Sequence, residues 1–319
     1  MTTAAAILAM ILIGVAGANL AIGRLPRKPP MPGVLVGAGR RGLHCIENPG
    51  DGPAVVLIHG MPGLAQDWKP VTDELPAGFR SLAIDRPGYG YSPGKLLTFF
   101  DQVDVVYAVV KELNVREAVF VGHSYGAIFA LEIAIRYPEI VRALVLTAPA
   151  AGGTRLAPRR LKVARIVRRL QLPVVRQIAD LFFLRAVRAT AARRGARSAY
   201  GASADFADAR HRAESVLARH NSIAALMSDR LEFDDVNRGQ TGRVGEVGAA
   251  TTIIHGSRDA SVPLRNARRL EDALPNSSLV EVAGATHILP ETHPAVVAEA
   301  IVAATANSSS PAAPDSKPR

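Results

Sequence analysis

Residues 117–134 read EAVFVGHSYGAIFALEIA, and this stretch decides the fold. Its first six residues have strand character, and helical spacing begins at Ser124. Between them lies a Gly-x-Ser-x-Gly pattern, which in this context is typical of a sharp turn that presents a serine at the carboxyl end of a strand. Gly122 and Gly126 have a steric role, because side chains there would collide with the neighbouring strand and helix. The alternative is an ordinary glycine-rich turn.

The chain on both sides of this turn alternates between strand and helix patterns. Further strands are expected at 42–47, 54–60, 79–85, 142–149, 251–256 and 277–283, and further helices at 99–113, at 263–273 and from Pro294. Strands that are separated by helices pair in parallel through crossover connections. The sequence therefore predicts an α/β fold, with a mostly parallel central sheet and helices on both faces.

About 100 residues, roughly 150–250, interrupt this alternation. Two amphipathic helices are expected inside the insertion, around 163–170 and 174–182. Residues 155–219 hold 15 Arg and 1 Lys against 3 Asp and 1 Glu, which accounts for the net charge of +10. Three interpretations stay open: solvated helix faces, contact with anionic lipid headgroups, or binding of an acidic substrate or nucleic acid. Nucleic acid is the weakest, because the run lacks aromatics spaced for base stacking.

The ends of the chain differ from the middle. Residues 4–23 form an uncharged apolar run long enough to span a bilayer, and three basic residues follow at 24–28. We expect residues 1–23 to be a membrane anchor with the folded part on the cytoplasmic side. The alternatives are a signal segment cleaved near 16–18, giving a secreted protein, and a buried or dispensable helix. A Pro-rich linker at 24–33 precedes the domain at 34–306, and a disordered tail is expected at 307–319.

Several other chemistries are disfavoured. Cys45 is the single cysteine, so the chain has no internal disulfide and no cysteine-based zinc site. Residues 37–42 fit G-x-G-x-x-G but precede a strand, whereas a dinucleotide fingerprint opens a helix. His211, His220 and His293 lack metal-ligand spacing, and no cofactor is implied.

A serine hydroxyl is a weak nucleophile near neutral pH, so chemistry at Ser124 requires a base and an acid that orients it. Asp259 follows the strand at 251–256, and His287 follows the strand at 277–283. Both fall in loops at the carboxyl ends of strands, where Ser124 is also expected. We therefore predict Ser124 as nucleophile, His287 as general base and Asp259 as the orienting acid.

A developing oxyanion requires backbone donors beside the serine. The segment His59-Gly60-Met61-Pro62-Gly63 follows the strand residues AVVLI at 54–58, where a second oxyanion donor is needed. The expected donors are the amides of Met61 and of Tyr125, the residue after the nucleophile. Pro62 has no N–H, and His59 is expected to be a structural residue.

These motifs resemble the α/β-hydrolase superfamily, in its serine esterase/lipase and C–C hydrolase branch. The resemblance covers 33–306 and includes Asp85-Arg86-Pro87-Gly88-Tyr89-Gly90-Tyr91-Ser92. It implies that this segment is a structural loop, that Asp85 is not the triad acid, and that 150–250 is a helical lid. Branches that open epoxides or displace halide carry Asp at the position of Ser124. One departure is Ala127, where family members often have Gly.

The resemblance implies hydrolysis of an ester or related acyl bond of a small apolar molecule through an acyl-enzyme. Lid residues Leu181, Phe182 and Phe183 are expected to line the pocket. Two alternatives stay open: a C–C bond hydrolase with the same triad, and a ligand-binding homologue with slow turnover. The expected partners are the substrate and, through the N-terminal helix or the Arg-rich lid, a membrane, and not nucleic acid.

Overall fold

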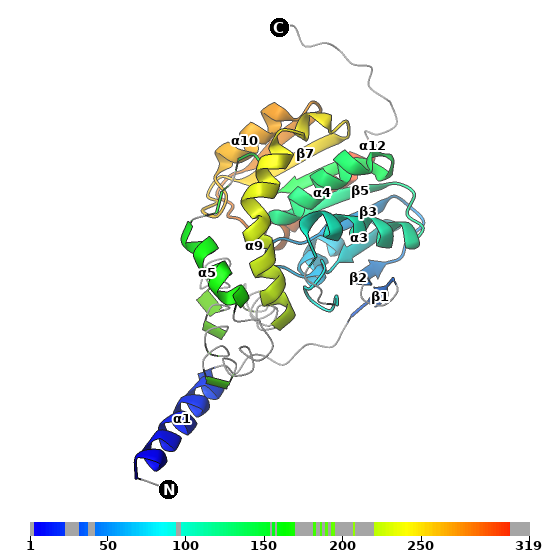
Figure 1. The fold of residues 1–319 in the computed structure, drawn as a ribbon. Coiled ribbons are helices and arrows are strands. Elements are labelled where there is room, and N and C mark those ends of the chain that lie inside the picture. The colour runs from blue at the N-terminus through cyan, green and yellow to red at the C-terminus, as the bar shows by residue number, and fades with distance from the viewer. Residues whose placement is uncertain are drawn as a thin grey trace.

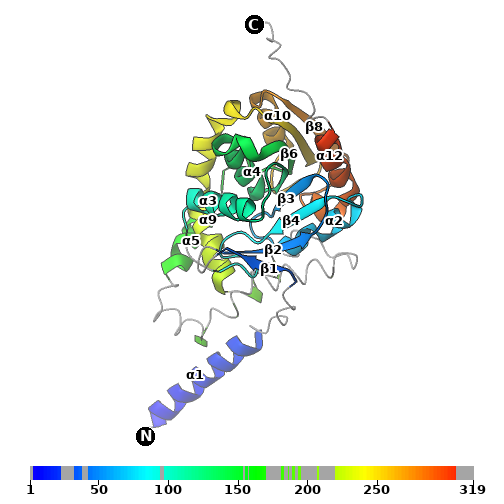
Figure 2. The ribbon, with the colours of Figure 1, turned by 90° about the vertical axis from the view of Figure 1, so that its right-hand side faces the viewer.

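A computed structural model describes residues 3–22, 32–37, 42–93, 97–153, 155–156, 158–169 and 220–306, with a few positions between 181 and 207. Figures 1 and 2 show a central sheet flanked by helices, with helix α1 projecting from one end. The α/β architecture predicted from the sequence is confirmed. The tail at 307–319, the linker at 24–31 and most of the insertion lie outside the described residues.

The sheet has eight strands in the order β1-β2-β4-β3-β5-β6-β7-β8. β1 and β2 run antiparallel to their neighbours, and the other pairs are parallel. The strands are β1 (Val34–Val36), β2 (Leu43–Asn48), β3 (Ala54–Ile58), β4 (Arg80–Ile84), β5 (Ala118–His123), β6 (Val141–Thr147), β7 (Ala250–Gly256) and β8 (Ser277–Val282). The three-residue β1 at the edge of the sheet was not predicted, because so short a segment shows no periodicity.

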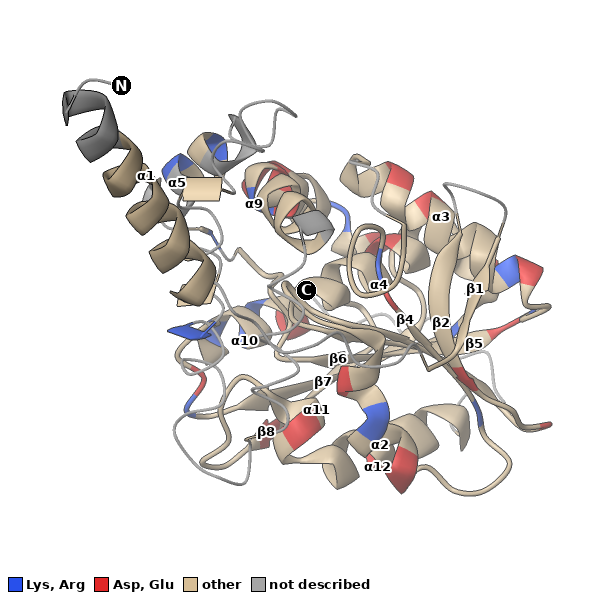
Figure 3. Cartoon of the chain, turned by 90° about the horizontal axis from the view of Figure 1, so that it is seen from below, with Lys and Arg blue, Asp and Glu red and all other residues tan. Residues whose placement is uncertain are grey.

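Both faces of the sheet are covered, as Figure 3 shows from below. Along β5, Phe120 packs into the core beneath α3 and α4, whereas Val119 and Val121 pack into the core beneath α2 and α12. All three side chains are fully buried. Burial of this kind stabilises the fold by about 1.5–3 kcal/mol per large apolar side chain. A parallel sheet covered on both sides explains why its strands are continuously apolar.

Most of the helices match the expected ones, with three exceptions. The four-residue helix α11, just before Pro294, was not expected. A short helix, α2, was not expected, and neither was the long helix α9, which leads from the insertion back to the core. The helices are α1 (Thr3–Ile22), α2 (Lys69–Glu74), α3 (Phe99–Glu112), α4 (Tyr125–Arg136), α5 (Pro158–Arg169), α9 (His220–Thr241), α10 (Leu264–Ala273), α11 (Leu289–Thr292) and α12 (Pro294–Ala306).

Helix α9 shows why its pattern is hard to see. Its apolar residues Phe233 and Val236 pack on the core, while Asp229, Asn237 and Gln240 are polar and also buried. Polar residues at buried positions obscure the apolar stripe that a helix normally shows.

The N-terminal apolar run forms helix α1, from which several large side chains project into solvent. Within the part of the chain that the structure describes, no helix combines the length and the apolarity needed to cross a membrane. The membrane anchor predicted for residues 1–23 stays a prediction.

Candidate active site

Ser124 lies in a strained turn between β5 and α4. Its φ of 53° falls in the left-handed region, which a residue with a side chain rarely adopts. A Cβ on Gly122 would meet Ala127 Cα at 2.6 Å, and one on Gly126 would meet the carbonyl oxygen of Ile58 at 2.2 Å. The two glycines are therefore required by close backbone approach on both sides of the serine.

Three side chains from distant parts of the chain meet at this turn. His287 Nε2 lies 3.0 Å from Ser124 Oγ, and His287 Nδ1 lies 2.7 Å from Asp259 Oδ2. The Asp259 side chain is fully buried, whereas the His287 side chain is 18% exposed. The structure thus brings the three predicted catalytic residues together in hydrogen-bonding order, with the serine end open to solvent.

The Asp259 carboxylate is held in its charged form. Its second oxygen, Oδ1, accepts hydrogen bonds from the amides of Ser261 at 2.7 Å and Val262 at 2.9 Å. Burial alone would raise the pKa of Asp259, but these bonds and the contact with His287 outweigh it and leave the pKa below its ordinary value. A charged Asp259 accepts a hydrogen bond from His287 Nδ1–H, which keeps that proton on Nδ1 and leaves Nε2 free to take the proton of Ser124.

The predicted oxyanion loop packs directly against the nucleophile. Strand β3 ends at Ile58, two residues earlier than expected, because residues 59–63 already form this loop. A Cβ on Gly60 would lie 3.2 Å from Ser124 Cβ, so glycine allows the close approach. The next residue, Met61, is half-buried, and Tyr125 at the start of α4 is fully buried. Gly60 of the oxyanion loop and Tyr125 at the start of α4 therefore lie on two sides of Ser124, and the donor roles of Met61 and Tyr125 stay predictions.

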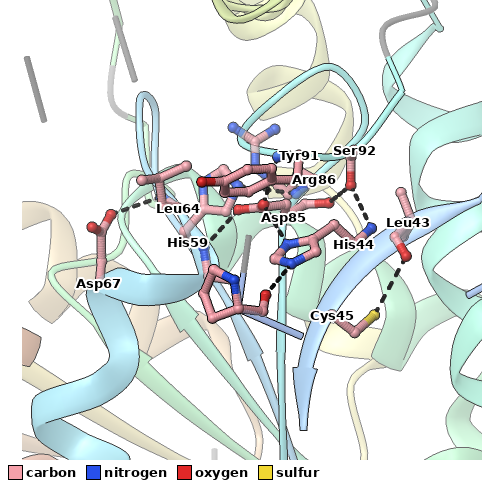
Figure 4. A network of polar contacts seen from close by, with 12 residues as sticks. Leu43, His44, Cys45, His59, Leu64, Asp67, Asp85, Arg86, Tyr91 and Ser92 are labelled. Atoms are coloured by element: carbon pink, nitrogen blue, oxygen red, sulfur yellow. Dashed lines mark hydrogen bonds and ion pairs between the residues drawn. The ribbon is translucent and has the colours of Figure 1, made fainter. Parts of the chain in front are cut away.

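Asp85 lies in a separate polar network, drawn in Figure 4. Its carboxylate contacts His44 Nδ1 at 2.7 Å and accepts hydrogen bonds from the amides of Ala65 and Tyr91, each at 2.8 Å. Its main-chain carbonyl accepts a bond from the hydroxyl of Ser92. Because both carboxylate oxygens hold these loops, the contacts of Asp85 are structural.

Three further histidines lie near the site and are neutral for the same reason. Burial is the largest cause that lowers the pKa of His59, His123 and His255, the pKa of His123 falling to about 3. The ring of His123 is 5.0 Å from that of His287, and His255 Nε2 is 3.5 Å from Asp259 Oδ2. His123 and His255 thus lie beside the triad without adding positive charge, and neither was a predicted site residue.

These histidines predict a pH dependence of stability. Below about pH 6.5 the unfolded chain binds protons at these positions and the folded protein does not. The free energy of unfolding should therefore fall as the pH drops from about 6.5 towards 3. Urea unfolding at pH 7.5 and pH 5 measures this loss. His123→Gln, which cannot be protonated, should show a smaller loss between the two pH values; an equal loss would contradict the assignment for His123.

The expected pocket residues are less well defined. Leu181 is 55% exposed and Phe182 is half-buried, while Phe183 lies outside the described residues. The pocket lining therefore stays a prediction. Across the described ranges, no group of three or more His, Cys, Asp or Glu side chains is arranged to hold a metal ion.

Comparison with known proteins places this geometry in context. A family model for the alpha/beta hydrolase fold matches residues 53–294. The bifunctional epoxide hydrolase 2 of Sus scrofa is 40% identical over 117 residues, which is 35% of this chain and 20% of that protein. The chain thus spans about a fifth of the length of that relative.

Longer matches come from smaller proteins. The 2-hydroxymuconate semialdehyde hydrolase of Pseudomonas sp. strain CF600 is 28% identical over 254 residues, covering 77% of this chain and 83% of that protein. A thermophilic esterase from Thermogutta terrifontis superimposes with a TM-score of 0.67 at 20% identity, covering 87% of this chain and 99% of that one. The structural match shows a shared fold.

Proposed function

We propose that this chain, which belongs to the α/β-hydrolase fold family, is a serine hydrolase that cleaves an ester or related acyl bond through an acyl-enzyme. The observation that carries the proposal is the 3.0 Å contact between Ser124 Oγ and His287 Nε2, with Asp259 2.7 Å behind the imidazole. This is the geometry that activates a serine hydroxyl.

The proposed reaction has two halves. Ser124 Oγ attacks the acyl carbon while its proton passes to His287 Nε2, and the amides of Met61 and Tyr125 stabilise the oxyanion. The tetrahedral intermediate expels the alcohol, which takes the proton from His287. Water then attacks the acyl-enzyme by the same route, releasing the acid and restoring Ser124.

Epoxide opening is disfavoured despite the likeness to an epoxide hydrolase. Attack of a carboxylate on an epoxide carbon forms an ester, which water hydrolyses at its carbonyl. Attack of Ser124 would instead form an alkyl ether, which has no carbonyl for water to attack. The enzyme would be alkylated once and would not turn over.

A second candidate is hydrolysis of a carbon–carbon bond next to a carbonyl, with the same three residues. It is favoured by the likeness to the 2-hydroxymuconate semialdehyde hydrolase over 77% of the chain. Turnover of p-nitrophenyl esters of increasing acyl length, measured beside turnover of a diketone whose second carbonyl is conjugated with the carbanion that leaves, separates the two. A burst of p-nitrophenol without turnover would instead favour the slow ligand-binding homologue.

A fluorophosphonate probe tests the proposal directly. The probe should label the protein once, at Ser124, because only a hydroxyl activated by a base beside an oxyanion site attacks phosphorus rapidly. Peptide mass spectrometry locates the adduct. Prior reaction with a slowly hydrolysed ester should block labelling; an adduct on another serine would refute the assignment.

A further inference from the structure

A buried arginine lies next to the proposed oxyanion site. Arg86 follows β4, and its side chain is 0% exposed. The guanidinium carbon is 4.5 Å from the ring centre of Tyr89, 5.0 Å from that of Tyr125 and 4.8 Å from that of Phe129. Aromatic faces attract a cation, especially one removed from water. Arg86 is therefore a fixed positive charge in contact with Tyr125, one of the two residues proposed to bind the oxyanion.

Helix α9 supplies the counter-charge. Asp229 Oδ2 accepts hydrogen bonds from Arg86 Nη1 at 3.0 Å and from the Tyr89 hydroxyl at 2.8 Å, and Oδ1 accepts one from Gln102 Nε2 at 3.2 Å. The Asp229 side chain is also fully buried. A planar guanidinium with bonds in two directions has little freedom to rotate, so Asp229 determines where Nη2 points.

The second amino group of Arg86 is directed at the oxyanion loop. Nη2 donates a 2.9 Å hydrogen bond to the carbonyl oxygen of Gly60. The same oxygen contacts His59 Nδ1 at 2.9 Å, and His59 Nε2 accepts the main-chain N–H of Arg86 at 3.0 Å. Neutral His59 with its proton on Nδ1 satisfies both contacts. Two donors therefore fix the orientation of a single carbonyl.

That carbonyl belongs to the peptide group that contains the Met61 N–H. In a planar trans peptide the C=O and the N–H point in opposite directions. The Gly60–Met61 peptide is trans. Holding the Gly60 oxygen on Arg86 therefore turns the Met61 N–H to the other side of the loop. A donor bonded to the carbonyl also polarises the peptide and strengthens its N–H as a donor.

We propose that Arg86, held by Asp229 of helix α9, is a positioning residue that orients the Gly60–Met61 peptide for oxyanion binding. The inference rests on the proposed function. The buried ion pair between Arg86 and Asp229 connects helix α9 to the oxyanion loop. Arg86 reaches the reaction through the peptide and not by touching the substrate.

If Arg86 and Asp229 only stabilised the fold, their variants would not weaken the binding of a negatively charged intermediate. A buried pair of this kind is costly to disrupt, so variants will lose stability under either interpretation. The distinguishing property is stabilisation of negative charge on the tetrahedral intermediate. A trifluoromethyl ketone measures it, because addition of Ser124 forms a hemiketal whose oxygen occupies the oxyanion site.

The experiment compares Arg86→Lys, Arg86→Met, Asp229→Asn and Tyr89→Phe with the wild type. Removing one oxyanion donor outright typically lowers kcat by 10²–10³. Misorienting the peptide in Arg86→Met or Asp229→Asn should lower kcat by about 10-fold to 100-fold, raise the inhibition constant of the ketone by a similar factor, and change KM less than about threefold. Arg86→Lys should restore part of the loss. Tyr89→Phe keeps the ring under the guanidinium and should have the smallest effect.

Glu132→Gln is the matched control. Glu132 of α4 is buried and accepts hydrogen bonds from Gln240 Nε2 of α9 at 3.2 Å and from Arg243 Nη1, just after α9, at 3.3 Å. It should lower Tm and leave the ketone inhibition constant unchanged. Folded Arg86 and Asp229 variants that behave like this control would overturn the inference. A wild type that forms no hemiketal at Ser124 would overturn the proposed function, and the inference with it.

Discussion

Replacing Ser124 by alanine should lower kcat by about 10⁶-fold, which corresponds to about 8 kcal/mol of transition-state stabilisation. The fold should survive, because Ser124 N donates to Thr147 O and its carbonyl accepts from Ala127 N and Ala150 N, and alanine keeps these main-chain bonds. Circular dichroism with ester hydrolysis at saturating substrate separates the two effects. Fluorophosphonate labelling should disappear at the same time.

The double variant Ser124→Ala/His287→Ala tests whether the two residues act together. Ser124 and His287 act as a unit, so His287→Ala should cost nearly as much as Ser124→Ala, and the double variant should be no worse than either alone. Independent roles would instead give losses that multiply. Retention of more than about one per cent of wild-type kcat in Ser124→Ala would show that another group is the nucleophile.

Replacing Asp259 by asparagine should lower kcat by about 10²–10⁴. Asparagine keeps an oxygen that the amides of Ser261 and Val262 can reach, so the loop remains supported. Its amide group donates towards His287, which favours the tautomer with the proton on Nε2, and that nitrogen then cannot take a proton from Ser124. The effect should appear in kcat, with KM little changed.

Asp85→Asn is the matched control, because both carboxylates are buried and both contact a histidine at 2.7 Å. The Asp85 carboxylate contacts His44 and the amides of Ala65 and Tyr91, and none of these contacts is with the triad. Its loss should therefore lower the free energy of unfolding by about 1–3 kcal/mol and leave kcat within a few-fold. If the folded Asp85 variant lost catalysis and the Asp259 variant retained it, the assignment of the acid would be wrong.

Several features could be predicted from local sequence, for a common reason. Parallel strands begin and end in register, so residues that follow different strands converge at one edge of the sheet. Ser124 follows β5, Asp259 follows β7 and His287 follows β8, so their meeting required no knowledge of packing detail. The role of the glycines beside Ser124 could also be predicted, because only glycine allows so close an approach of neighbouring backbone.

The α/β order of elements and the three residues at the strand ends could thus be predicted from local sequence, because both are encoded in periodicity and in positions along single segments. The partners of buried charged residues depend on tertiary packing instead. Arg86 and Asp229 lie 143 residues apart, and Asp229 belongs to a helix whose buried polar residues hide its pattern. Whether a charged side chain is solvated or buried against a partner depends on which elements pack together. Local periodicity carries no information about that choice.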